Sequence, residues 1–411
     1  MHDALDLLDP DAYARDGYPW RAWAELRRHH PVSKRRHGES AEYWAIVRHA
    51  DVVAVSRRPA DFLSAPRLNM PPRRVRPGQN ADFLPESIIT MDPPKHAAFR
   101  ALTSRHFTPR ALSAFEPRIA ALAREIVARA LERFGDGAEF DFVDEVSARL
   151  PLAVIMELLG VPRADWEALL ALANQTVGAG DPEYNKGGEV STQVAVAAAK
   201  AIFEHYARYI AERRRKPAND LMSVLVQVEV DGRKLRDDEV LGYCFLLTAA
   251  GNETTRNATT GGMLALLEHP DQLARLRAEK SWLRGADEIV RWVSPIIHFC
   301  RTAAVDAEIG GERIRAGDTV TMFYPSAARD EAAFASPETF DVGRAPNPHV
   351  SFGIGEHYCL GARLARLELA AIVREWVTAV AEFECTAPIE RLRSIVIGGI
   401  KHMRVRIAPA R

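Results

Sequence analysis

The stretch from Val350 to Ala370, VSFGIGEHYCLGARLARLELA, places a single cysteine, Cys359, directly ahead of a helical pattern. Apolar residues follow the cysteine at spacings of four, three and four, which predicts a helix that begins at or just after it. These residues are Leu360, Leu364, Leu367 and Ala371. At a helix N-terminus the free backbone N–H groups and the helix dipole stabilise a thiolate, so we expect this sulfur to be a good metal ligand.

Glycines lie on both sides of the cysteine, at Gly353, Gly355 and Gly361. They remove side chains around the sulfur, as expected if a flat, bulky group approaches the backbone closely. The alternative is a glycine-rich turn around a buried thiol, because lone cysteines are more often core residues than chemical groups. Motifs elsewhere in the chain are needed to distinguish a metal ligand from a buried thiol.

The composition is that of an ordinary globular protein with 411 residues, 47% of them hydrophobic and 27% charged. Lys and Arg number 54 against 55 Asp and Glu, so the charge balance indicates no nucleic acid or anionic membrane as a partner. The four cysteines show neither a C-x-x-C pair nor zinc spacing. The start of the chain lacks secretory-signal features, and the longest apolar run is too short to span a bilayer. We therefore expect a cytoplasmic protein without a membrane anchor.

The expected elements indicate one domain over residues 1–411 that is mainly α, with an α+β character. Most β structure is expected in residues 1–65 and 300–345, including a strand at EYWAIVRH and a hairpin turn at Gly310-Gly311. From Asp92 the chain is mostly helical, and Asp92 itself is expected to cap a helix that starts with prolines.

The longest helical candidate covers residues 237–269, about 30 residues, and its first half is apolar on nearly every face. This helix should therefore run through the interior of the protein. Two segments, residues 66–87 and 178–188, have the composition of long irregular loops, and the sequence leaves open whether they form a mobile lid.

A wider pattern around Cys359 is much more specific than its glycines. It comprises Phe352, Gly355, His357, Cys359 and Gly361. The segment FGIGEHYCLG resembles the haem-binding loop of the cytochromes P-450 and matches each fixed position of that signature. The resemblance extends from about residue 92 to residue 407, and it implies the P-450 fold with haem b as cofactor. It also implies that Cys359 is the axial ligand of the iron, with Phe352 packed near the sulfur and the nearby glycines against the haem.

A second motif, AAGNETT, stands inside the long apolar helix and contains Gly251, Glu253 and Thr254. A glycine there costs on the order of 1 kcal/mol relative to alanine, and such a defect often marks a functional site, although a kink tolerated for packing is the alternative. The motif is similar to the oxygen-binding groove of the P-450 family. The resemblance implies that Gly251 lies against the cofactor, that Thr254 hydrogen-bonds bound dioxygen or its water, and that Glu253 supplies protons.

His96 and Arg100 lie four residues apart, on one face of an expected helix. Without further information they would be a solvated polar stripe. By resemblance to the family they bind the two haem propionates together with Arg301 and His357, a task that suits arginine because of its charge-assisted hydrogen bonds.

Glu288 and Arg291 form an i, i+3 pair worth roughly 0.2 to 0.5 kcal/mol on any surface helix. The resemblance implies instead that this pair is buried and joined by Arg344, with a structural role. Departures from the family pattern are small: Ala328 stands where Asn is frequent, and His357 replaces the Arg of other branches.

The family resemblance implies insertion of one oxygen atom from O2 into a hydrophobic small molecule, by hydroxylation or epoxidation. The chain has no nucleotide-binding glycine fingerprint and no spare cysteine cluster, so we expect ferredoxin and ferredoxin reductase as electron donors, docking on the cysteine side of a monomer. The expected substrate contacts are apolar. They are Leu247, Ala250, Ile296, Ile297, Val396 and Ile397.

The late segments of the chain look like those of bacterial members that hydroxylate sterols, branched lipids or terpenoids, although Arg404 stands where those relatives commonly carry proline. A tailoring oxygenase of polyketide or peptide natural products is the main alternative. A haem-based ligand sensor would need the cysteine but neither Thr254 nor Glu253. A peroxygenase, which uses hydrogen peroxide directly, usually replaces that pair.

Overall fold

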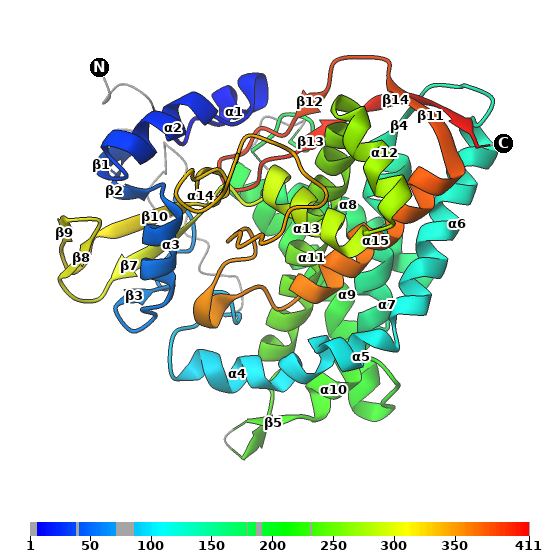
Figure 1. The fold of residues 1–411 in the computed structure, drawn as a ribbon. Coiled ribbons are helices and arrows are strands. Elements are labelled where there is room, and N and C mark those ends of the chain that lie inside the picture. Colours follow the sequence, from blue (N-terminus) through cyan, green and yellow to red (C-terminus); the bar gives the residue numbers. More distant parts are fainter. Residues whose placement is uncertain are drawn as a thin grey trace.

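The computed structural model describes residues 6–37, 41–70, 86–178, 180–185, 191–230 and 232–410. Its helices are α1 (Pro10–Asp16), α2 (Trp20–His29), α3 (His49–Ser56), α4 (Lys95–Ser104), α5 (Pro109–Ser113), α6 (Glu116–Phe134), α7 (Arg149–Leu159), α8 (Trp166–Val177), α9 (Ser191–Arg215), α10 (Leu221–Gln227), α11 (Asp237–Glu268), α12 (Pro270–Glu279), α13 (Trp282–Val293), α14 (Tyr324–Ala327) and α15 (Ala362–Ala379). Most of them gather into one helical body, with a β-rich lobe beside it (Figure 1). The mainly α fold class is therefore confirmed.

Helix α11 runs through the middle of this body, as predicted (Figure 1). Its 32 residues span about 48 Å at 1.5 Å per residue. It packs against α7, α9, α13 and α15, and buried residues occur along its whole length. A helix that is covered on every side needs no solvent-facing polar stripe, and the first half of α11 is accordingly apolar on nearly every face.

The strands are β1 (Val32–His37), β2 (Ala41–Ile46), β3 (Phe62–Leu63), β4 (Phe140–Asp141), β5 (Glu229–Val230), β6 (Arg233–Lys234), β7 (His298–Ala303), β8 (Ala307–Ile309), β9 (Glu312–Ile314), β10 (Thr319–Phe323), β11 (Val380–Cys385), β12 (Glu390–Arg391), β13 (Ile400–His402) and β14 (Arg404–Pro409). The β-rich lobe holds a sheet of order β1-β2-β10-β7-β3, in which β2 and β10 are parallel and the other pairs antiparallel. The strand expected at EYWAIVRH is β2.

The hairpin expected at Gly310-Gly311 is also present, between β8 and β9. Both glycines have positive φ, 59° and 85°, as a two-residue hairpin turn of this type requires. A further sheet of order β11-β14-β4 joins the end of the chain to residues 140–141, far from it in sequence. The sequence did not predict this sheet, because only a long-range pairing produces it.

The prediction that Asp92 caps a helix is wrong, because the cap position lies two residues later, at Pro94. Helix α4 begins at Lys95, and no side chain caps it. The Asp92 carboxylate instead accepts the backbone N–H groups of Ser64 and Ala65, at 2.6 and 3.0 Å. Asp92 therefore fastens the chain after β3 to the segment that leads into α4.

The two irregular segments lie only partly within the described residues. Of residues 66–87, the stretch 71–85 falls outside them, and so do residues 179 and 186–188 of the second segment. None of the helices in the described ranges combines the length and hydropathy that a membrane span requires.

Candidate active site

A largely apolar cavity of about 220 Å³ lies where α11, β7 and the loop before α15 meet. Helix α11 contributes Leu247, Ala250, Gly251 and Thr254 to its wall, and the loop contributes Phe352, Gly353, Cys359 and Gly361. Residues from distant parts of the sequence are thus brought together around one space. Cys359 and Thr254, the two residues to which the sequence assigned chemistry most directly, both face it.

Cys359 sits three residues ahead of α15, close to the predicted position. Its backbone N–H donates to the carbonyl of Phe352 at 2.8 Å, which closes the loop around the sulfur. The expected lowering of the thiol pKa is not found. Burial raises the pKa of Cys359, while the N–H of Gly361 and the charges of Arg100 and Arg366 lower it by less. The thiol will therefore stay protonated until a metal displaces its proton.

The three loop glycines have different reasons for being glycine. A Cβ on Gly361 would meet nothing within 4 Å, and Gly353 adopts φ 70°, so both keep the cavity wall free of side chains. Gly355 does not line the cavity: its φ is 78°, and a Cβ there would lie 2.4 Å from the carbonyl oxygen of Ser56. We therefore correct the prediction for Gly355, which permits contact with the end of α3 rather than with a bound group.

Four basic side chains gather at one edge of the cavity. Arg100, Arg301 and His357 line it, and the His96 ring lies 4.1 Å from the His357 ring, centroid to centroid. His96 is 1% exposed, and neither of its ring nitrogens has a hydrogen-bond partner among the described residues. The Glu356 carboxylate is 3.7 Å from Nδ1, beyond hydrogen-bond range.

Within the described ranges, Arg100 and Arg301 donate to the carbonyls of Tyr358 and Cys300, and neither has a carboxylate partner. Burial, followed by the charges of Arg301, His96 and Arg100, lowers the pKa of His357 to about 3. Carboxylates bound here would relieve this mutual repulsion and would give the His96 nitrogens a partner. The cavity is apolar, with a cysteine in its wall and glycines beside the cysteine, and two arginines at one edge have no carboxylate partner in the described part of the chain. These features fit a haem with its two propionates.

Thr254 and Glu253 are neighbours in sequence but face different surroundings. The Thr254 hydroxyl lines the cavity and donates to the Ala250 carbonyl at 2.8 Å. Glu253 is 2% exposed and does not line the cavity. Its carboxylate accepts hydrogen bonds from Arg256 and, at 3.1 Å, from Asn257. Glu253 is therefore held in a buried ion pair beside the cavity.

Gly251 lets another helix approach the cavity. A Cβ at this position would lie 2.8 Å from Cδ1 of Ile155 in α7, so only glycine fits this crossing without a shift. Its lack of a side chain also leaves room on the cavity side, where Gly251 contributes backbone to the wall.

The Glu288 and Arg291 pair is completely buried, as the family resemblance implied, with a distance of 2.7 Å between Nη2 and Oε1. Arg344 joins it at 3.1 Å and also donates to the carbonyls of Ala335 and Thr339. These bonds fix the irregular chain that leads into the cysteine loop. The role of the three residues is structural.

The structure brings only some of the expected substrate contacts to the cavity. Leu247, Ala250 and Ile296 line it, whereas Ile297, Val396 and Ile397 do not. Successive residues of extended chain point in opposite directions, so Ile297 packs instead into the core cluster around Trp23. Residues 396–397 lie beside Ile296, because Ile397 and Ile296 form an antiparallel backbone bridge.

Sequence analysis missed other apolar wall residues and one acid. The missed apolar residues include Ile88, Ile89, Phe299 and Tyr324. The acid is Glu368 in α15, which is 2% exposed and whose Oε2 has no hydrogen-bond partner in the described part of the chain. Burial raises the pKa of Glu368 well above its usual value. Its place four residues after Leu364 and three before Ala371 was the available signal, because that spacing puts an acid on the apolar face of the helix.

Comparison with known proteins gives a consistent result. The family model described as "Cytochrome P450" matches residues 189–379. The chain is 39% identical to the steroid C26-monooxygenase of Rhodococcus jostii, covering 98% of this chain and 85% of that protein. It is 37% identical to the methyl-branched lipid omega-hydroxylase of Mycobacterium tuberculosis, covering 98% and 93%. Among solved structures it resembles Mycobacterium marinum cytochrome P450 CYP268A2 in complex with pseudoionone, with 37% identity, 99% coverage of both chains and a TM-score of 0.91.

Proposed function

Because this chain belongs to the cytochrome P450 family, we propose that it hydroxylates the end of a hydrophobic chain carried by a sterol or a methyl-branched lipid. The protein is a haem-thiolate monooxygenase that uses O2, a lipophilic substrate and redox partners. The relatives named above act on a steroid and on a methyl-branched lipid, and they support the proposed substrate class.

The observation that carries the proposal is the apolar wall that leads to Cys359. Leu247, Ala250, Ile296 and Phe299 supply apolar side chains around the space that Thr254 and Cys359 also face. Transfer of a hydrocarbon from water into a cavity with this lining is favourable, whereas a polar substrate would find few hydrogen-bond partners there. Arg301 and Arg100, the charged groups in the wall, are assigned to the haem propionates.

In the proposed arrangement Cys359 ligates the haem iron, and Phe352, Gly353 and Gly361 lie against the cofactor near the sulfur. His96, Arg100, Arg301 and His357 hold the propionates. When bound, the haem supplies the activation of O2 that side chains alone cannot perform.

The side chains of α11 supply protons. Thr254 holds a proton at Oγ1 in the cavity wall, where its hydroxyl already donates to the Ala250 carbonyl. Glu253 lies next to Thr254 in the chain and, once released from Arg256, replaces that proton from its carboxyl group. A carboxyl group that passes its proton to a hydroxyl is suited to general acid catalysis in a site that excludes bulk water.

We assign the role of electron donor to an acidic ferredoxin, which receives its electrons from a ferredoxin reductase. Arg105 and Arg110 are exposed, and the elements that carry them contact α4 and α15. Helix α4 reaches the cysteine loop through Arg100, which donates to the Tyr358 carbonyl, and α15 follows that loop in the chain. Tyr358, 39% exposed, lies in that loop. A basic surface next to the cysteine would bring an acidic donor close to the iron.

The test is a spin-state titration of the purified ferric protein, read from its Soret band. The panel comprises sterols, methyl-branched fatty acids, terpenoids and macrolides. A saturable low-spin to high-spin shift with sterols or branched lipids, followed by a terminal alcohol in turnover with ferredoxin and reductase, is the expected result. A shift with macrolides alone would replace the proposal by the tailoring-oxygenase alternative. Equal product yield from hydrogen peroxide without ferredoxin would indicate a peroxygenase.

A further inference from the structure

Arg256 lies one helical turn after Glu253 in α11 and binds it tightly. Both side chains are 3% exposed, and a guanidinium N–H donates to the Glu253 carboxylate. The other terminal nitrogen of Arg256 donates to Oδ1 of Asn174 in α8, at 3.2 Å. Neither Glu253 nor Arg256 lines the cavity. The ion pair therefore keeps the proposed proton donor out of the space in which its proton is needed.

Tyr184, in the segment between α8 and α9, is close enough to this ion pair to act on the charge of Arg256. Its phenol acts on the Arg256 guanidinium: burial opposes the charge, but Glu253 and Tyr184 together raise the pKa of Arg256. Burial also raises the pKa of Tyr184 to about 12, so the phenol is neutral at physiological pH. Tyr184 sits tightly, because a Cβ on Gly178 would lie 2.3 Å from its ring.

Residues 180–185 are themselves fastened to the last strands of the chain. Asp181, 1% exposed, accepts the Arg393 backbone N–H at 3.0 Å and the Lys401 ammonium at 3.2 Å. The Glu183 carboxylate lies 2.9 Å from Nε2 of His402. The chain that carries Tyr184 is thus anchored at two positions directly ahead of it, Asp181 and Glu183.

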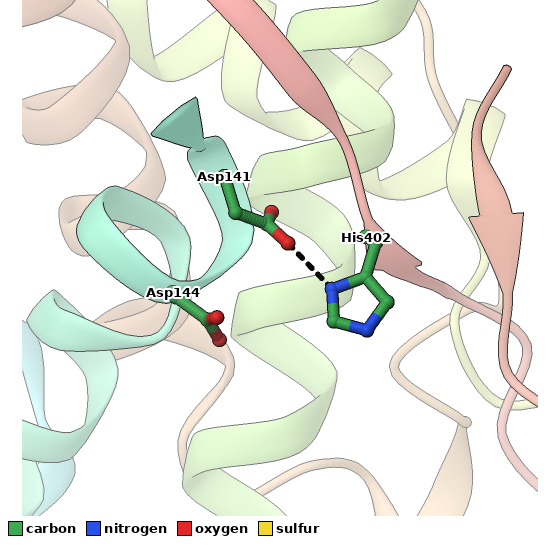
Figure 2. Close-up of side chains that lie close together, drawn as sticks. All are labelled: Asp141, Asp144 and His402. Carbon is green, nitrogen blue, oxygen red and sulfur yellow. Dashed lines mark hydrogen bonds and ion pairs between the residues drawn. The ribbon is translucent and has the colours of Figure 1, made fainter. Parts of the chain in front are cut away.

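His402 continues this network to Asp141, whose Oδ2 lies 2.5 Å from Nδ1 (Figure 2). Burial opposes protonation, yet Asp141 and Glu183 raise the pKa of His402 above its usual value. Asp141, Asp144 and His402 lie close enough together to hold a metal ion. Since carboxylates already engage both ring nitrogens of His402, we assign the histidine to the anchoring of residues 180–185.

We infer that Arg256 is a positioning residue that controls when Glu253 can deliver protons, and that Tyr184 orients Arg256 for this task. The inference rests on the proposed role of Glu253. While Arg256 binds the carboxylate, Glu253 stays in the ion pair and outside the cavity wall. When this hold weakens, the carboxylate takes a proton from solvent and passes it to Thr254, so each proton delivered is replaced by one taken up.

Other charged groups also lie near the pair. Asp144 precedes α7 within η3 (Val143–Ser147), and its pKa is raised by burial and by Asp141, while His402, Arg149 and Arg256 oppose the shift. Glu183 acts on Tyr184 from within residues 180–185. These groups stay in place in the variants below, so a change in pH dependence reports on Arg256 and Tyr184.

The first experiment does not depend on turnover. Difference infrared spectra of the haem-loaded ferric protein detect the C=O band of a protonated carboxyl at neutral pH. Arg256→Gln should create such a band, because loss of the adjacent cation favours the neutral form of a buried carboxyl. The band should vanish in the Arg256→Gln, Glu253→Gln double variant. A folded Arg256→Gln protein with no new band would overturn the inference.

The second experiment measures coupling, the share of consumed electrons that appears in product rather than in peroxide. Tyr184→Phe is the milder variant, and it should shift the pH profile of coupling in the same direction as Arg256→Gln, by a smaller amount, with unchanged substrate affinity. Profiles that superpose on wild type in both variants would contradict the positioning role.

The control is Arg213→Gln, which removes another largely buried ion pair, with Asp220 at 2.7 Å, in α9. It should leave the infrared band and the pH profile as in wild type. Failure of the proposed function is distinguished by Glu253→Gln alone. If that variant keeps full coupling, Glu253 delivers no protons, whatever the infrared result says about Arg256.

Discussion

Glu368 is a carboxyl group inside the wall of an apolar cavity, and its burial has a consequence for stability. Because burial raises its pKa in the folded protein, Glu368 keeps its proton at pH values where the unfolded chain has lost it. Stability should therefore fall as pH rises above the ordinary value of 4.5, by up to about 1.4 kcal/mol per pH unit until the folded pKa is reached.

Glu368→Gln keeps the shape of the side chain but cannot ionise. The variant should lose this part of the decline in stability, which urea unfolding midpoints of the haem-loaded protein between pH 5 and 8 would show. Variant and wild type should agree at the acidic end and diverge toward pH 8. Parallel curves over the whole range would show that Glu368 is ionised in the folded protein.

Thr254 offers a second prediction at this scale. Thr254→Ala removes the Thr254 hydroxyl from the cavity wall. It leaves the helix intact, since alanine is the better helix former. We expect a fall in coupling of about tenfold or more, with the lost electrons recovered as peroxide, because general acid catalysis commonly contributes at least that much. Thr259→Ala, at a buried hydroxyl of the same helix that is not part of the cavity wall, is the control and should stay coupled. Wild-type coupling in Thr254→Ala would remove the proton-delivery role.

At the scale of elements, the loop before α15 lies tightly against the end of α3 at Gly355. Gly355→Ala would place a Cβ 2.4 Å from the Ser56 carbonyl oxygen, in a backbone with φ 78°. Gly317→Ala is a matched control, because Gly317 has φ 88° and nothing within 4 Å. Both variants share the strain of positive φ, of order 1 kcal/mol, and only Gly355→Ala adds the clash.

We therefore expect Gly355→Ala to retain haem poorly and Gly317→Ala to retain it almost as wild type does. The ratio of Soret to protein absorbance after gel filtration measures this directly, and the unfolding midpoint of each variant reports the strain. Equal haem loss in the two variants would show that the backbone conformation, and not the contact with α3, maintains the loop.

How far the sequence could predict the molecule is also clearest for elements. Helix α11 and the β8–β9 hairpin were predicted because an unbroken apolar run and a Gly-Gly pair are local signals. Asp92 was misassigned because its carboxylate serves Ser64 and Ala65, which only the folded chain brings near. Residue pairings between distant segments, such as β14 with β4, leave no local trace in one sequence.

The same distinction applies within the site. Cys359 and Thr254 belong to contiguous motifs, so their place at the cavity could be expected. The direction in which Ile297 points, and the partner that Glu253 binds, depend on how whole elements pack together. A motif therefore identified the residues of the site, but not the neighbours that control them.

For the molecule as a whole, electrons have to pass from a partner protein to the haem held by Cys359. The proposed docking surface predicts that exposed charges near the cysteine loop, and not the net charge of -1, govern the reaction with an acidic ferredoxin. Arg105→Glu with Arg110→Glu should raise KM for reduced ferredoxin several-fold and weaken its dependence on salt, since fewer attractive charges remain to be screened. Arg313→Glu reverses a charge in the exposed β8–β9 hairpin, where the side chain is 79% exposed, and should change neither quantity.

Stopped-flow reduction under carbon monoxide at several ionic strengths separates docking from chemistry, because it records electron arrival without turnover. In wild type the rate at limiting ferredoxin should fall as salt rises, and the double variant should start lower and fall less. Electron transfer at saturating ferredoxin should be the same in both, since the charges act on encounter and the path to the iron is unchanged. If the Arg105 and Arg110 substitutions leave the salt dependence intact while Arg313→Glu abolishes it, the donor docks beside the β-rich lobe, and the proposed surface is wrong.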